Sequence, residues 1–285
     1  MPKAEQITAP DSIHGEGPVW STDWDGLRWV DMLAGDVLHL DPRTGEVSRW
    51  HVGKVAAALR PRTSGGAVIA TEREFLLCDQ INGPLHHPVE AFTDRTIRFN
   101  EGTCDPAGNF LCGTMAYDES PGRGTLYRLN PHRSVEIVLT GITISNGLCW
   151  TADAAQAYYV DTPTGQIDVF DSDHTGQLSN RRKFAAINAT GTPDGLTVDS
   201  QGGVWVALWG GGAVHRYSPA GALDEIIYLP VPYVTACTFG GDHLDELYIT
   251  TSQLLKTPDA AGAGAGALFR APCPVTGQPA ATFCG

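Results

Sequence analysis

The chain has 285 residues and a formal net charge of −13, from 32 acidic and 19 basic side chains. Such an acidic surface disfavours nucleic acid and anionic membranes as partners. Hydrophobic residues make up 42% of the chain, which is enough for a sizeable core, and 33 glycines with 19 prolines indicate many tight turns.

The N-terminal region has no apolar run of the kind found in a signal peptide. No stretch approaches the roughly 18–20 apolar residues of a membrane span. The seven cysteines show no Cys-x-x-Cys spacing, and most lie inside apolar runs. We therefore expect a cytoplasmic protein whose cysteines are buried thiols, with neither disulfides nor a zinc site.

The first of several repeated units begins at Glu16. Residues 16–32 read EGPVWSTDWDGLRWVDM: a polar residue, a short apolar stretch, a second polar residue five positions later, a turn and a strand. The same order recurs in residues 100–115, 146–162 and 194–209. The first and second polar residues of the four copies are Glu16/Ser21, Asn100/Asp105, Asn146/Thr151 and Asp194/Asp199.

Two weaker copies complete the series. Residues 65–70 and 245–250 align with residues 202–207, which places their first positions at Ala57 and Cys237. The six first positions then lie 41, 43, 46, 48 and 43 residues apart. A period near 45 is typical of propeller blades built from four short strands.

The segments between the copies read as strand, turn, strand. In residues 36–52 and 124–139 the turns carry Asp-Pro or Asn-Pro, which is suitable chemistry for a hairpin connection. No long segment has the helical period. We predict an all-β, six-bladed β-propeller with four-stranded antiparallel blades around a central channel, forming a single domain over residues 1–285. The Gly- and Ala-rich residues 259–277 read as a loop followed by the closing strands.

The first position of each copy is the strongest functional signal. Equivalent positions in a propeller lie at equivalent places around the channel, and we place these at its mouth. Carboxylate and amide oxygens suit calcium, magnesium or manganese and tolerate zinc or ferrous iron. A turn is the simpler explanation of any single Asn-Gly or Asp-Gly pair, but it does not explain Glu16. We expect one divalent cation, of open identity, near the four oxygen-bearing residues Glu16, Asn100, Asn146 and Asp194.

Five short motifs resemble those of the senescence-marker-protein/gluconolactonase family, which includes regucalcin. They are GEGPVW (15–20), RFNEG (98–102), GTM (113–115), SNGL (145–148) and PDGL (193–196). They appear in the family's order, and the resemblance extends from about residue 13 to about residue 275. A further stretch, ALWGGGAV (207–214), looks more like bacterial sugar lactonases than like animal regucalcin.

The resemblance implies a six-bladed propeller with one divalent metal in the channel. It implies that the metal ligands are Glu16, Asn146 and Asp194, and that Arg98 and Asn100 bind substrate.

Two acidic positions near these motifs match the family's pattern less closely than the motifs themselves do. Glu101 stands where the family usually has Asp, and its longer side chain would alter the substrate pocket. An acidic residue shortly after GTM contacts substrate in some members. Asp118 has that spacing and Glu119 is adjacent, so the sequence leaves the choice between them open.

The resemblance also implies an activity, the hydrolysis of an aldonolactone to the open-chain acid. Asp194 would act as the catalytic residue, accepting a proton from the attacking water and returning it to the leaving alkoxide. A cation would polarise the lactone carbonyl. The expected partner is a small sugar lactone, and the chain is expected to be a monomer or a weak oligomer.

Two alternatives remain open at the level of the sequence. One is a non-catalytic calcium-binding propeller, although Arg98 and Asn100 are not needed for metal storage. The other is a metal-dependent esterase or phosphotriesterase with a related site.

Overall fold

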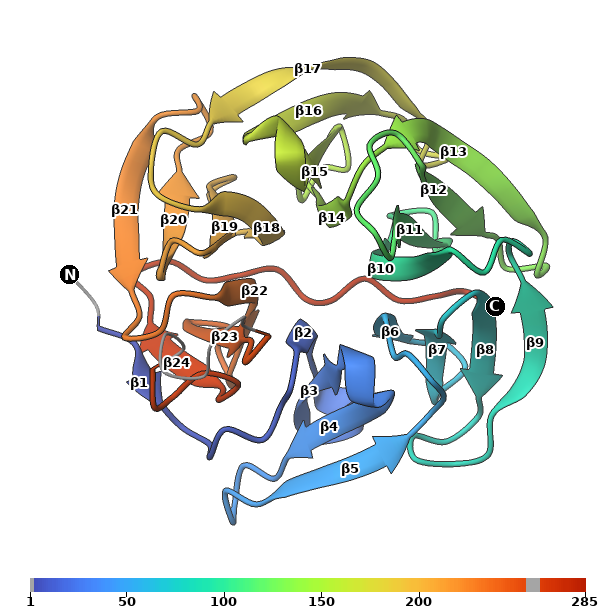
Figure 1. The fold of residues 1–285 in the computed structure, drawn as a ribbon, viewed down its shortest axis with the longest axis horizontal. Helices are drawn as coiled ribbons and strands as arrows, with labels where there is room; N and C mark the ends of the chain where they lie inside the picture. Colours follow the sequence, from blue (N-terminus) through green and yellow to red (C-terminus); the bar gives the residue numbers. More distant parts are fainter. Residues whose placement is uncertain (1–2, 255–261) are drawn as a thin grey trace.

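Six four-stranded antiparallel sheets surround a central axis in the computed structural model, which describes residues 3–254 and 262–285 (Figure 1). The prediction of an all-β, six-bladed β-propeller is therefore confirmed. The described residues contain no α-helix. Their helical turns are three short 3₁₀ helices: η1 (Thr22–Trp24), η2 (Met32–Ala34) and η3 (Thr162–Thr164).

Five of the blades take their four strands consecutively from the chain, with the first strand nearest the axis. The first of these blades contains β2 (Gly15–Ser21), β3 (Gly26–Asp31), β4 (Asp36–Leu40) and β5 (Val47–His51). The second contains β6 (Ala58–Pro61), β7 (Ala67–Ala70), β8 (Glu74–Cys78) and β9 (His86–Glu90). The next three are β10 (Ile97–Cys104), β11 (Phe110–Ala116), β12 (Gly124–Leu129), β13 (Val135–Ile142); β14 (Ser145–Trp150), β15 (Gln156–Asp161), β16 (Gln166–Ser172), β17 (Leu178–Ala186); and β18 (Thr192–Val198), β19 (Val204–Trp209), β20 (Ala213–Tyr217), β21 (Leu223–Tyr228).

The sixth blade joins the two ends of the chain. It contains β22 (Val234–Gly240), β23 (Glu246–Thr251) and β24 (Phe269–Pro272), and its outer strand is the N-terminal β1 (Glu5–Gln6). The prediction that residues 259–277 supply the closing strands is wrong for the outermost strand of this blade, which is β1. Residues 259–261 lie outside the described residues, and the described remainder contributes β24 alone. A two-residue strand with both side chains exposed leaves no periodic signal in the sequence.

Burial follows the position of a strand within its blade. β3, β7 and β11 are buried along their whole length, because neighbouring blades cover both faces of each sheet. In β7 this gives a continuous apolar run, AVIA, instead of an alternating pattern. The outer strands β5 and β9 are mostly exposed or half-buried.

Five of the six inner strands have an irregular register, and in four of them it falls at the predicted repeat position. In β22 it falls before Ala236, whereas the predicted position Cys237 pairs regularly with Ile249, so that prediction is wrong by two residues. In each case the inner strand holds one residue more than its neighbour, which is the definition of a β-bulge. The bulges lie between Glu16 and Val19, Phe99 and Glu101, Ser145 and Leu148, Pro193 and Leu196, and Val234 and Ala236. A bulge redirects side chains that a regular pleat would point elsewhere, so it can aim polar residues into the channel.

The C-terminal residues 273–285 cross the ring after β24 (Figure 1). The backbone N–H of Ser200 donates to Thr276 on one side of the ring, and that of Phe283 donates to Pro61 on the other, both at 2.8 Å. Residues Gln278–Ala281 line a cavity of about 240 Å³ together with residues from all six inner strands. This C-terminal segment therefore covers one end of the channel, which leaves the opposite end as the mouth.

Candidate functional site

A ring of buried polar side chains lies where the inner strands bulge. Glu16, Asn100, Asn146 and Asp194 come from β2, β10, β14 and β18 and are each at most 5% exposed. Among the described residues, no group of three or more His, Cys, Asp and Glu side chains could hold a metal ion. A cation bound here would therefore need amide oxygens as well as carboxylates.

The carboxylates of this ring lie close enough to raise one another's pKa values. Burial raises the pKa of Glu16 well above its ordinary value, and the nearby charge of Glu101 raises it further. The pKa of Asp194 is raised first by burial, then by Glu16 and by Glu101. Burial also raises the pKa of Glu101 to about 7, against the opposing charge of Arg60. Bringing a divalent cation among these groups would relieve both the desolvation and the repulsion.

Asn146 has one satisfied end and one unsatisfied end. Its Nδ2 donates to Thr162 Oγ1 at 2.9 Å, while its Oδ1 is buried and has no hydrogen-bond partner among the described residues. Leaving a buried carbonyl oxygen unpaired costs about 1–3 kcal/mol. The Asn146 side chain also lies within hydrogen-bond reach of the Asp194 carboxylate. An unpaired amide oxygen on this side chain is a ligand type that suits a hard divalent cation.

Asn100 differs from Asn146 although both occupy a repeat position. Its Oδ1 accepts from Arg98 Nη1 at 2.7 Å, and its Nδ2 donates to the Ser145 carbonyl at 2.9 Å. Both ends of this amide are therefore used within the protein. Asn100 therefore holds Arg98 in place, and its oxygen, unlike that of Asn146, already accepts a hydrogen bond.

Arg98 is buried and tightly constrained. Besides Asn100, its Nη1 donates to the Phe99 carbonyl at 2.9 Å and lies 3.0 Å from Met32 Sδ. The guanidinium also lies over the ring of Tyr117, 5.9 Å from its centroid. This arrangement presents a cation of fixed position next to the carboxylates of the ring.

The acidic pair after GTM is exposed. Asp118 Oδ1 accepts from the backbone N–H of Ser120 at 3.1 Å, whereas the charge of Glu119 acts on Arg98 and opposes the lowering of its pKa by burial. The neighbouring Tyr117 donates its hydroxyl to Glu72 Oε1 at 2.6 Å. Of the two candidates, Glu119 is thus the one whose charge reaches the site.

An aromatic group lies beside the ring, and of its members only Trp209 falls within one of the sequence motifs, ALWGGGAV. His14 packs edge-on against Trp209 at 5.8 Å, and Trp209 in turn packs against Tyr233 at 4.6 Å. Burial and the charge of Arg98 lower the pKa of His14 to about 3, so its imidazole is neutral. These residues lie on three different blades, and no local sequence signal connects them.

Glu101 lies at the end of the channel that the C-terminal segment covers. It lines the cavity beneath the C-terminal segment with Arg60 and Cys149, and its Oε2 has no hydrogen-bond partner among the described residues. The bulge between Phe99 and Glu101 allows the adjacent Asn100 and Glu101 both to be buried in the channel. A role for Glu101 in binding substrate stays a prediction.

Fold and site together define a six-bladed propeller with a polar, carboxylate-containing site in its channel. The profile described as the SMP-30/Gluconolactonase/LRE-like region matches residues 14–253, and the chain belongs to this family. The resemblance inferred from the motifs is confirmed. Within the described residues, no helix is both long and apolar enough to cross a membrane.

Relatives of both enzymatic and calcium-binding description are similar to this chain. A pentonolactonase of Haloferax volcanii is 35% identical over 273 residues, covering 93% of this chain and 92% of the relative. Regucalcin of Danio rerio is 34% identical over 270 residues, covering 90% and 92%. A solved structure of a calcium-binding regucalcin from Agrobacterium tumefaciens superposes with a TM-score of 0.92 at 25% identity, covering 98% and 96%. The sequence identity to the pentonolactonase and to the Danio rerio regucalcin is nearly the same.

Proposed function

We propose that this protein is a lactonase that hydrolyses a sugar lactone to the open-chain aldonic acid, with a divalent metal ion in the channel. The observation that carries the proposal is the buried Asn146 Oδ1, which has no partner among the described residues. Its side chain lies at Asp194, whose carboxylate is close enough to Glu16 for each to be affected by nearby acidic charge, and the fixed guanidinium of Arg98 acts on Glu16. The pentonolactonase relative supports the reaction class.

Glu16, Asn146 and Asp194 are the residues that would hold the metal. Two carboxylates and one amide oxygen are compatible with calcium, magnesium, manganese, zinc or ferrous iron. When bound, such an ion would supply Lewis-acid polarisation of a substrate carbonyl.

The remaining chemistry falls to the side chains of this chain. Asp194 accepts a proton on its carboxylate from the attacking water and returns it to the alkoxide oxygen that leaves when the lactone opens. Arg98, held by Asn100, donates to oxygens of the sugar or of the carbonyl, and Glu119 or Asp118 contacts substrate at the mouth.

The test is lactone ring opening, followed with a pH indicator against a protein-free blank. Chelator-stripped protein should be inactive and should regain activity with a single divalent metal. Asp194→Asn should lower kcat by about a hundredfold to ten-thousandfold. The matched control is Asp168→Asn, a buried carboxylate on β16 that pairs with Arg181 and should leave turnover unchanged. Full activity in Asp194→Asn would refute the assignment.

A second candidate is a calcium-binding protein without lactonase activity, which the regucalcin relatives favour. It predicts tight calcium binding with no turnover of any aldonolactone. Turnover of a different ester or a phosphotriester with the same metal dependence would instead identify a related hydrolase.

A further inference from the structure

Two blades carry the same short turn next to a ring residue. Residues 30–35 read VDMLAG and residues 160–165 read VDTPTG. In both, a strand ends at the aspartate, one 3₁₀ turn follows (η2 or η3), and a glycine with positive φ ends it: 73° at Gly35 and 65° at Gly165. We call these two segments the Asp turns.

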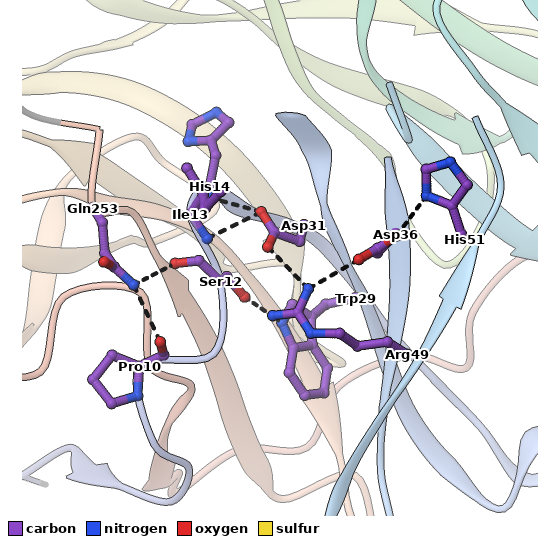
Figure 2. A network of polar contacts seen from close by, with 10 residues as sticks. All are labelled: Pro10, Ser12, Ile13, His14, Trp29, Asp31, Asp36, Arg49, His51 and Gln253. Atoms are coloured by element: carbon purple, nitrogen blue, oxygen red, sulfur yellow. Dashed lines mark hydrogen bonds and ion pairs between the residues drawn. The ribbon is translucent and has the colours of Figure 1, made fainter. Parts of the chain in front are cut away.

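Each Asp turn fixes the backbone that leads into an inner strand. Asp31 Oδ1 accepts from the backbone N–H groups of Ile13 and His14, both at 3.0 Å (Figure 2). The backbone N–H of Met32 then donates to the His14 carbonyl at 2.9 Å. Glu16 follows two residues later, so this turn positions the start of β2.

The second Asp turn repeats these contacts. Asp161 Oδ1 accepts from the backbone N–H of Ile144 at 2.9 Å and from that of Thr143 at 3.2 Å. The backbone N–H of Thr162 donates to the Ile144 carbonyl at 3.1 Å. Asn146 follows Ile144 by two residues, as Glu16 follows His14.

The residue after the aspartate distinguishes the two turns. Thr162 Oγ1 accepts from Asn146 Nδ2, whereas Met32, at the equivalent place, has no hydroxyl and contacts Arg98. The difference matches the ring residues. An amide has two chemically different ends and must be oriented, while the two oxygens of the Glu16 carboxylate are equivalent. Glu16 is held instead by the Gly17 backbone N–H, which donates to its Oε2 at 3.0 Å.

We propose that Thr162 is a positioning residue of the metal site: its hydroxyl holds the Asn146 amide so that Oδ1 faces the ring. Asp161 fixes the backbone from which Thr162 reaches Asn146. The inference rests on the proposed function, because it requires a cation at Asn146 Oδ1. Partners that orient metal ligands typically account for about 10–100-fold in metal affinity.

The experiment is a calorimetric titration of chelator-stripped protein with calcium chloride and, in parallel, with manganese chloride. Thr162→Val removes the hydroxyl at nearly constant shape and should weaken binding about 10–100-fold, with a similar Tm for the metal-free protein. Thr162→Ser keeps the hydroxyl and should restore the affinity. Thr164→Val is the control within the same turn, because its hydroxyl donates to the Asp161 carbonyl and not to Asn146.

A double-mutant cycle with Asn146→Ala separates orientation from general stabilisation. Thr162→Val should cause no further loss of affinity once Asn146 is alanine. Wild-type affinity in Thr162→Val, or an equal loss in both backgrounds, would overturn the inference. Wild-type affinity in Asn146→Ala would overturn the proposed ligand set itself, which is a distinguishable result.

Discussion

The blades β6–β9 and β14–β17 occupy similar places in the ring but serve it differently. Inner strand β6 pairs residue for residue with β7 from Ala58 to Pro61, and the repeat position before it is Ala57. Inner strand β14 bulges and directs Asn146 into the channel with an unpaired oxygen. The repeat position next to β6 therefore has an apolar side chain, whereas that of β14 has a buried amide oxygen without a hydrogen-bond partner among the described residues.

The difference between the two inner strands distinguishes residues that stabilise the fold from residues that form a binding site. A regular, apolar inner strand buries surface at no polar cost, while an unpaired buried oxygen lowers stability. Such a destabilising group is retained at functional sites because the bound ligand interacts with it favourably. Substitutions near β6–β9 should therefore change stability, and substitutions in the polar ring should change metal binding and activity.

The largest effect on stability is expected from Phe283→Ala. Phe283 is fully buried in the core cluster that contains β6–β8, and it anchors the C-terminal segment there. Removing a buried phenylalanine side chain should lower the free energy of unfolding by about 3–5 kcal/mol, measured by urea denaturation. Metal affinity of the folded protein should not change. A loss of metal affinity without a loss of stability would break the comparison.

Glycine substitutions in the two Asp turns should give unequal effects. A Cβ at Gly35 would lie 1.6 Å from the Gly53 carbonyl oxygen, whereas a Cβ at Gly165 would meet nothing within 4 Å. Gly165→Ala should cost about 1 kcal/mol because of its positive φ, and Gly35→Ala at least about 2 kcal/mol more because of the clash. Thermal unfolding of both variants measures the difference. Equal effects would show that the first turn is not tightly packed.

Glu16→Gln should stabilise the metal-free protein by about 1 kcal/mol while abolishing metal-induced stabilisation. The pKa of Glu16 is raised in the folded state, so the metal-free wild type should lose stability as the pH rises above the ordinary value of 4.5. Glu16→Gln removes this contribution. Thermal unfolding in chelator at pH 5 and pH 8 tests it, with the exposed Glu46→Gln as the control. A destabilised Glu16→Gln protein at pH 8 would contradict the expectation.

Much of the fold could be predicted because its signals are local. The period near 45, the turn residues and the apolar runs depend on neighbouring residues, and they led to six blades and to the four polar ring positions. The closure of the ring by β1 could not be predicted, because Glu5 pairs with Arg270 across nearly the whole chain. Similarly, the group of His14, Trp209 and Tyr233 forms only when three blades meet.

Asn100 and Asn146 show where the sequence stops being informative. The sequence by itself determined that both are amides at equivalent repeat positions shortly before a glycine, because repeat register is a local property. The tertiary structure alone decided that Asn100 hydrogen-bonds to Arg98 and to the carbonyl of Ser145, which is 45 residues away. It also decided that the side-chain oxygen of Asn146 has no hydrogen-bond partner among the described residues. The physical reason is that a buried polar atom is satisfied by whichever groups the neighbouring blade brings within hydrogen-bond distance.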